Sequence, residues 1–131
     1  MTESSSKRRF AMVLCALALS ACGGSTVGQV TDITSGEDLF MARVLGNRAG
    51  CVTCHSLESG TRLAGPSLAG IGEVAASRVE GMSATEYLRQ SIVEPNAFLV
   101  DGFRKDTMPT DYVLSLTDAQ VDALVEYMEG L

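Results

Sequence analysis

The chain has 131 residues, 46% of them hydrophobic and 5% aromatic, with no tryptophan and a formal net charge of −6 at pH 7. This length fits one small domain, and the acidic balance disfavours binding to nucleic acid or to anionic membrane surfaces. Residues 22–131 carry 7 basic and 15 acidic side chains, a formal net charge of −8. Such a surface either steers docking onto a basic partner or simply maintains solubility.

The first 21 residues are typical of an export signal. Three basic residues at 7–9 precede an apolar stretch, 10–19, that is too short to span a membrane. The sequence LSAC, ending at Cys22, resembles the lipobox of bacterial lipoproteins, in which the cysteine is acylated and becomes the mature N-terminus. We therefore expect a lipoprotein signal peptide, lipidation at Cys22, and anchoring on the outer (periplasmic or extracytoplasmic) face of the cell membrane. An ordinary signal peptide is the alternative.

Residues 22–34 are small and polar, contain glycines and show no hydrophobic periodicity. They are typical of a flexible tether, which at this length spans on the order of 20 Å. The remaining residues, 35–131, form the predicted domain.

The first predicted helix begins at Ser35. This residue is a good N-cap, and Asp38 three positions later gives an acidic variant of the capping box. Leu39 and Phe40 supply an apolar side, and the pattern extends to about Gly46.

The most informative motif is Cys51-Val52-Thr53-Cys54-His55, which contains the single histidine of the chain. Two thiols three positions apart, followed at once by an imidazole, suit covalent attachment of a c-type haem. The two cysteines would form thioethers with the porphyrin, and His55 would become an axial ligand of the iron. Export agrees with this interpretation, because c-type haem is attached outside the cytoplasm.

Two other interpretations of the cysteine pair are weaker. A structural zinc site needs four nitrogen or sulfur ligands, but the chain has four cysteines and one histidine, and Cys15 and Cys22 lie in or beside the export signal. A thioredoxin-like redox pair needs a βαβ context, and no alternating strand pattern surrounds the motif.

The second predicted helix begins at Ser83, with Glu86 at the capping-box position, and Pro95 ends it. Its inward-facing residues are Tyr87, Leu88, Ser91 and Ile92.

The third predicted helix has Thr117 as its N-cap, with Gln120 three residues on, and stops at Gly130. Its apolar face consists of Val121, Leu124, Val125 and Met128, at helical spacing. No strand pattern of convincing length is present, so the predicted class is all-α.

Met108 lies in a non-periodic stretch between the second and third predicted helices and is followed by Pro109. The proline stiffens the loop, which suits a ligand that presents one sulfur to iron. We assign Met41, Met82 and Met128 to packing or exposure instead.

These features together resemble class I cytochromes c of bacterial lipoprotein type. In that family a glycine and an aromatic residue on the first helix contact a leucine and an aromatic residue on the last helix. Gly36 and Phe40 match the first pair, and Leu124 and Tyr127 match the second. The resemblance implies three main helices packed around one covalently bound haem.

The resemblance also implies a ligand set. Gly65-Pro66 follows the haem motif at the family's usual spacing, where the proline carbonyl accepts the ring N–H of the axial histidine. Met108-Pro109 matches the family's distal-ligand signature, so His55 and Met108 are the expected axial ligands of one haem c. The implied function is one-electron transfer without catalytic residues or a small-molecule substrate.

The stretch 91–109 is similar to two groups. One is the small monohaem lipoprotein subunit of alternative complex III, a quinol-oxidising membrane assembly, and the other is the cytochrome domain fused to some cytochrome oxidase second subunits. The acylated cysteine favours the first, with partners that include other subunits of that complex and a terminal acceptor in a respiratory or photosynthetic chain. A free-standing lipid-anchored carrier and a haem enzyme or gas sensor with an open sixth site remain alternatives.

Overall fold

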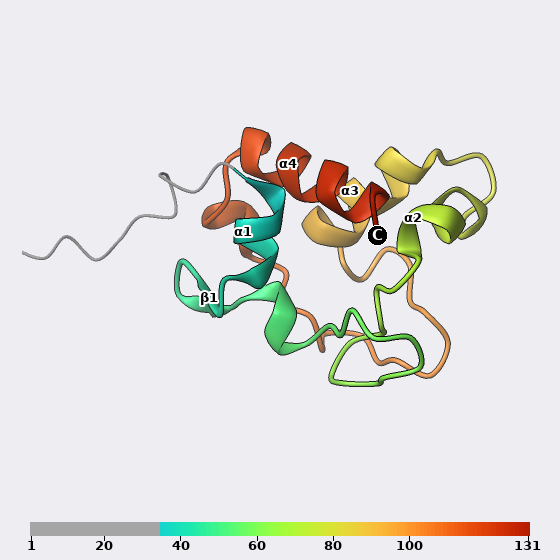
Figure 1. Ribbon diagram of the computed structural model, residues 1–131, viewed down its shortest axis with the longest axis horizontal. Helices are drawn as coiled ribbons and strands as arrows, with labels where there is room; N and C mark the ends of the chain where they lie inside the picture. The colour runs from blue at the N-terminus through green and yellow to red at the C-terminus, as the bar shows by residue number, and fades with distance from the viewer. Residues whose placement is uncertain (1–34) are drawn as a thin grey trace, which may run out of the picture.

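The computed structural model describes residues 35–131. The predicted signal peptide, Cys22 and the tether therefore lie outside the described residues. The main helices are α1 (Gly36–Met41), α3 (Ala84–Val93) and α4 (Asp118–Glu129), which lie together on one side of the molecule, with the long loops on the other (Figure 1). The shorter elements are β1 (Val44–Leu45), β2 (Arg48–Ala49), η2 (Cys51–Thr53), α2 (Ile71–Val74), η3 (Ala75–Ser77) and η4 (Tyr112–Leu114), where η denotes a 3-10 helix. The predicted helical class is confirmed.

The first and last helices pack directly on each other. A Cβ atom placed on Gly36 would stand 1.9 Å from the carbonyl oxygen of Ala123 and 2.7 Å from Cβ of Tyr127, so only a glycine permits this approach. Beside this point the rings of Phe40 and Tyr127 lie with centroids 5.5 Å apart, and Leu124 is fully buried. The predicted contact between these two helices is confirmed.

The extent predicted for the first helix was wrong. The helix ends at Met41 instead of continuing to about Gly46, and an antiparallel hairpin, β1–β2, follows it. Gly46 has a φ of 61° at the first position of a two-residue Gly-Asn turn, a conformation that glycine adopts without cost. Gly-Asn between two short segments is a hairpin signal, and the helical periodicity of Val44 and Leu45 concealed it.

The hairpin is fixed to the segment that precedes α4. Arg48 forms an ion pair with Asp111, and the Tyr112 hydroxyl donates a hydrogen bond to the carbonyl of Ala49 at 2.5 Å. Burial of Leu45 places one side of the hairpin in the core.

The caps predicted for all three helices are present. The Ser35 hydroxyl accepts from the Asp38 N–H at 3.3 Å, whereas the two later helices have complete capping boxes, Ser83 with Glu86 and Thr117 with Gln120. Each complete box satisfies backbone donors that the first turn of a helix leaves without partners.

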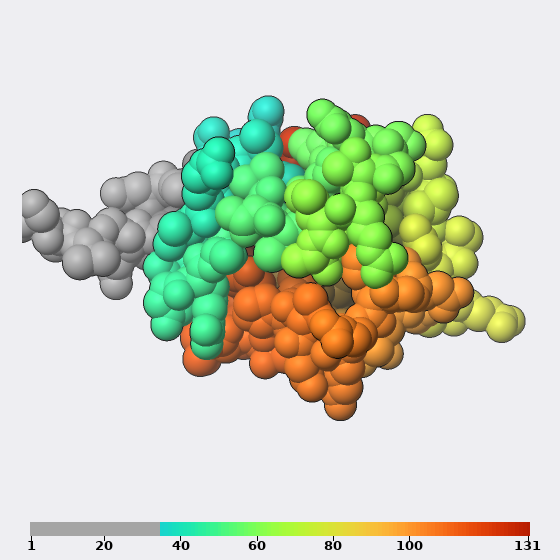
Figure 2. Space-filling view, turned by 90° about the horizontal axis from the view of Figure 1, so that it is seen from below, coloured from blue at the N-terminus to red at the C-terminus, as the bar shows by residue number. Residues whose placement is uncertain are grey.

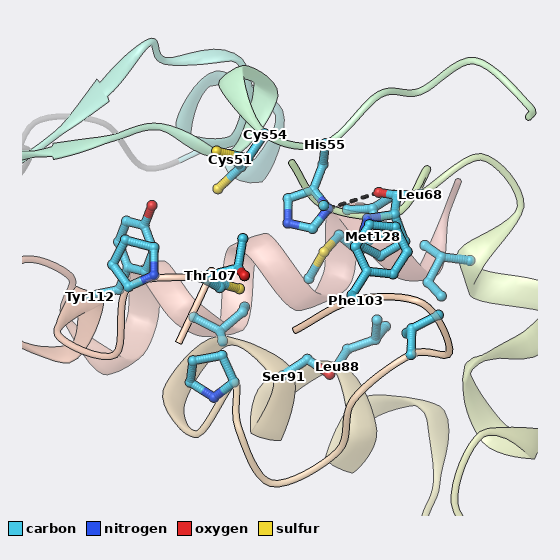
Figure 3. A pocket seen from close by; sticks show the side chains of 18 of the residues that line it. Cys51, Cys54, His55, Leu68, Leu88, Ser91, Phe103, Thr107, Tyr112 and Met128 are labelled. Carbon is cyan, nitrogen blue, oxygen red and sulfur yellow. Dashed lines mark hydrogen bonds between the residues drawn. The ribbon is translucent and has the colours of Figure 1, made fainter. Parts of the chain in front are cut away.

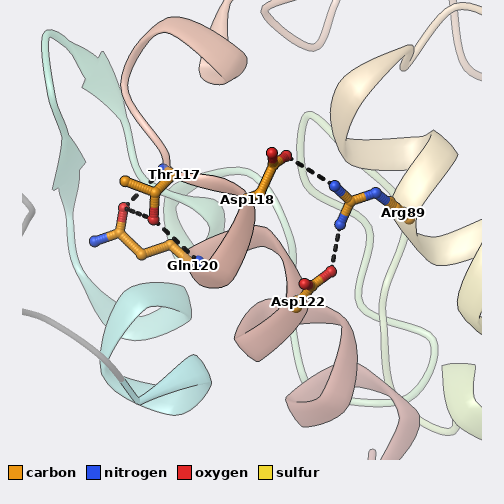
Figure 4. Close-up of polar contacts among 5 residues, drawn as sticks. All are labelled: Arg89, Thr117, Asp118, Gln120 and Asp122. Carbon is orange, nitrogen blue, oxygen red and sulfur yellow. Dashed lines mark hydrogen bonds and ion pairs between the residues drawn. The ribbon is translucent and has the colours of Figure 1, made fainter.

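Arg89 joins α3 to α4. Its guanidinium contacts the carboxylates of Asp118, at 2.9 Å, and Asp122 on the exposed side of the pair (Figure 4). Exposed ion pairs of this kind stabilise a protein by about 0–1 kcal/mol, so the helix pair is held mainly by buried residues. The most deeply buried side chains of the domain are Leu39, Phe40, Leu45, Ala75, Leu88, Val121 and Leu124.

The short helix α2 completes the frame. A Cβ atom on Gly72 would stand 2.1 Å from the Glu129 carbonyl oxygen, so α2 lies against the end of α4. None of the helices within residues 35–131 is long and apolar enough to cross a membrane.

Candidate haem site

A large apolar pocket lies between the helices and the two long loops. Its volume is about 1230 Å³, including the part open to solvent. Seen from below, its mouth is a hollow between the green atoms of the chain around 55–68 and the orange atoms of the chain around 98–110 (Figure 2). The helices contribute apolar side chains to its floor, among them Phe40, Leu88, Ile92, Leu124 and Met128.

The turn η2 places the cysteine pair and the histidine on one wall. The amide N–H groups of Cys54 and His55 both donate to the Cys51 carbonyl, at 3.1 and 2.9 Å. This tight turn brings the two free thiols and the imidazole to the same side of the pocket (Figure 3). The hydroxyl of Thr53 donates to the Gly50 carbonyl at 2.6 Å and braces the start of the turn.

The thiol of Cys51 is not activated. Burial is the main cause that raises its pKa to about 11, and the neighbouring Cys54 contributes to this rise. Reactive cysteines of thiol oxidoreductases have lowered pKa values, so this environment is the opposite of theirs.

His55 is oriented by Pro66. Nδ1 of His55 lies 2.9 Å from the Pro66 carbonyl oxygen. A carbonyl can only accept, so Nδ1 carries the proton and Nε2 keeps its lone pair for a metal. Burial lowers the pKa of His55, while the Pro66 carbonyl raises it, and the net direction favours the neutral imidazole that a metal requires.

Gly65 makes room for this ring. A Cβ atom on Gly65 would stand 2.5 Å from Cε1 and 2.7 Å from Nδ1 of His55. The sequence analysis noted the Gly65-Pro66 pair but did not predict that the glycine itself lies against the imidazole.

Met108 lies in the loop that forms the opposite wall. Figure 3 shows Thr107 and Phe103 across the pocket from His55. Met108 follows Thr107, is half-buried, lines the pocket and packs against the core.

A second thioether also lines the pocket. Met128, on the inner side of α4, is 7% exposed and belongs to the hydrophobic core, as the helical spacing predicted. Because it also contacts the pocket, sulfur type alone does not distinguish it from Met108. The difference lies in the backbone, since Met128 is held within a helix and Met108 on a loop.

Polar groups at the pocket are few. Ser91, Asn96, Arg104 and Thr107 contribute to its lining, together with Tyr112, which the sequence analysis missed. Burial is the main cause that raises the pKa of Tyr112 to about 12, so its hydroxyl stays protonated and donates to the hairpin.

A zinc site finds no support in the described part of the chain. Within residues 35–131 no three side chains of His, Cys, Asp or Glu come together as a metal-binding group. The pocket offers instead two thiols, one imidazole whose Nε2 keeps its lone pair, and the Met108 thioether, all along one apolar space.

Comparison with protein-family models gives a match to cytochrome c over residues 33–131. The chain belongs to the cytochrome c family. A comparison with curated proteins found no match. Membership implies electron transfer through haem, and the Cys51–Cys54 spacing in this cytochrome c domain fits covalent haem c. The apolar pocket beside the two thiols provides the space that such a group needs.

Proposed function

We propose that this cytochrome c is a membrane-tethered one-electron carrier that works as a subunit of a quinol-oxidising complex similar to alternative complex III. Lipid on Cys22 would hold the domain at the outer (periplasmic or extracytoplasmic) face of the cell membrane. Residues 1–21 would be removed as a signal peptide, and residues 22–34 would link the anchor to the domain.

Four side chains would hold the haem. Cys51 and Cys54 would form the thioethers, and His55, oriented by Pro66, would bind the iron through Nε2. Met108 would supply the second axial ligand from the facing loop. A bound haem iron supplies one-electron chemistry between its ferric and ferrous states.

The observation that supports this proposal is that His55 and Met108, from segments far apart in the sequence, both line one apolar pocket. If His55 and Met108 both bound the iron, no coordination site would remain for a substrate or a gas. The surrounding residues exclude water and fix the two ligands, and the domain contributes binding and potential rather than acid–base chemistry.

The tether would keep the domain close to its partners. A tether of about twelve residues would span on the order of 20 Å, so a lipid at Cys22 would keep the domain near the membrane surface and the proteins embedded there. The acidic balance of residues 22–131 would steer docking onto basic surfaces of those redox partners.

The test is purification from native membranes. We expect red protein in the membrane fraction, with haem retained in denaturing electrophoresis, accompanied by subunits of a quinol-oxidising complex. The variant Cys22→Ala is expected to leave the domain red and to release it from the membrane.

Three results would contradict parts of the proposal. Recovery of the wild-type cytochrome alone, without partner subunits, would identify a free-standing lipid-anchored carrier. Rapid, stoichiometric carbon monoxide binding to the reduced native protein would indicate an open sixth site, as in a haem enzyme or gas sensor. Colourless protein from a host that matures c-type cytochromes would overturn the haem assignment itself.

A further inference from the structure

The loop that carries Met108 is tied to the end of α3 by one side chain. The carboxamide of Asn96 donates from Nδ2 to the carboxylate of Asp106 at 2.8 Å. Its Oδ1 accepts from the backbone N–H of the same Asp106 at 2.9 Å. Asn96 therefore contacts both the side chain and the main chain of one residue, ten positions away.

Asp106 needs such support because its backbone is in the left-handed region. Its φ is 61°, and within residues 35–131 it is the one residue other than glycine with a positive φ. A non-glycine residue adopts this conformation at a cost in free energy, which a short polar side chain reduces. Two hydrogen bonds from Asn96 compensate this cost and fix the direction in which the chain leaves Asp106.

The direction matters because Met108 follows two residues later. Asn96 lines the same pocket as Met108, and it comes directly after Pro95, which is buried beyond the end of α3. The tie therefore connects a fixed point of the helical frame to the segment that presents the sulfur.

A second contact holds the start of the same loop. The guanidinium of Arg62 lies over the ring of Phe103, 4.1 Å from its centroid, and donates to the carbonyl of Gly102. This contact joins the loop that follows the haem motif to the loop of Met108. Asn96 holds the loop closer to Met108, through its two hydrogen bonds with Asp106.

We propose that Asn96 is a positioning residue for Met108: its paired hydrogen bonds to Asp106 keep the thioether directed into the pocket and so limit opening of the sixth position. This inference depends on the proposed ligand role of Met108. It adds a residue that touches neither the iron nor the haem-attachment motif in its hydrogen bonding.

The test exchanges the two side chains. Asn96→Asp keeps the acceptor for the Asp106 N–H but loses the Nδ2 donor and places two carboxylates together. Asp106→Asn keeps an acceptor oxygen and tolerates a positive φ, so we expect it to behave as wild type. In the double variant a carboxamide at position 106 faces a carboxylate at position 96. The side-chain hydrogen bond is thereby restored, with residue 106 now the donor and residue 96 the acceptor.

The readout is competition by exogenous imidazole in the ferric holoprotein. Imidazole binds when the Met108 sulfur leaves the iron, so its apparent affinity reports the fraction of open sites. We expect Asn96→Asp to bind imidazole about tenfold more tightly, as befits loss of one hydrogen bond to a charged group. Its weak red absorption band, which marks methionine-ligated ferric haem, should also decrease, and the double variant should regain both wild-type values.

A matched control separates positioning from general stability. Ser83→Ala removes the cap of α3 at the end remote from Asn96, and it should lower the thermal midpoint without changing imidazole affinity. If Asn96→Asp is recovered as holoprotein only in combination with Asp106→Asn, the pairing is supported as well.

Two results would overturn the inference. One is wild-type imidazole affinity and an intact red band in Asn96→Asp; the other is a double variant no better than Asn96→Asp. Failure of the ligand assignment gives a different result, because Met108→Ala would then retain the red band.

Discussion

Gly36 lies so close to Ala123 that a Cβ atom on the glycine would stand 1.9 Å from the Ala123 carbonyl oxygen. This approach joins the first helix of the domain to the last. The interface includes the Phe40–Tyr127 ring pair, and Phe40 also lines the haem pocket, so the contact fixes part of the site.

Gly36→Ala should therefore destabilise the domain. The added methyl group must push α1 away from α4, and overpacking of this kind lowers the free energy of unfolding by roughly 2 kcal/mol. Denaturant unfolding of the holoprotein measures the change. Gly130→Ala is the matched control, because its Cβ would have its nearest neighbour at 3.4 Å with a φ of −85°, and it should change stability little. Equal stability of the two variants would contradict the close-approach argument.

Substitution of the two pocket methionines should give different spectra. Met108→Ala is expected to abolish the weak red band of the ferric protein and to lower the reduction potential, because loss of the thioether removes a ligand that favours ferrous iron. Met128→Leu should keep the band and the potential while changing stability by less than about 1.5 kcal/mol, since the volume is nearly conserved. Loss of the band in Met128→Leu alone would reverse the ligand assignment.

Gly65→Ala should displace the His55 ring although neither proposed iron ligand is substituted. The new methyl group would stand 2.5 Å from the ring, so the imidazole must move and its hydrogen bond to Pro66 weakens. That bond makes the ligand more basic, and its loss disfavours ferric iron. We expect the potential to rise by roughly 40 mV, the equivalent of one hydrogen bond of about 1 kcal/mol in a one-electron couple.

The control for that measurement is Ser67→Ala. Its hydroxyl donates to the Glu58 carbonyl at 2.8 Å in the same loop, so the variant loses a loop contact but not the space beside the imidazole. An equal shift of potential in both variants would show that loop stability, not the position of His55, is responsible.

The capping box of α3 should make stability depend on acid pH. The backbone N–H of Ser83 and then its hydroxyl donate to Glu86, and these bonds lower the pKa of Glu86 below 4.5. A carboxyl whose pKa is lowered on folding stabilises the native state fully above its unfolded pKa, and this contribution is lost as the pH falls through the folded pKa.

Glu86→Gln should remove that dependence. We expect the difference in thermal midpoint between about pH 7 and about pH 3 to be smaller in the variant than in wild type. Glu80→Gln, which removes the same charge just before the helix, should retain the wild-type difference. A variant of Glu86 with an unchanged pH profile would contradict the role of the cap.

Local patterns predicted the helical frame well. Ser83 with Glu86 and Thr117 with Gln120 marked true helix starts, because a capping box depends only on residues within one turn. The contact of Gly36 with α4 came from the family resemblance, and the structure confirms it. The end of the first helix was missed, because two apolar residues after Met41 continued its periodicity while the chain turned into a hairpin.

The pocket was less predictable than the frame. Cys51, Cys54 and His55 lie within five residues, so one turn brings them together, and Met108, which its proline singled out, lines the same pocket. Gly65 against the imidazole, Tyr112 on the hairpin and Asn96 on Asp106 all involve segments that meet only after the chain has folded. No periodicity or spacing within either segment encodes such meetings.

The contact of α1 with α4 also has a kinetic consequence. The loop that this contact closes contains nearly the whole domain, so the closure entropy of a long loop is lost before the two helices can stabilise each other. Folding should thus be slow for so small a helical protein. An apolar group bonded to Cys51 and Cys54 would speed folding, because α1 and α4 could both pack against it before they contact each other.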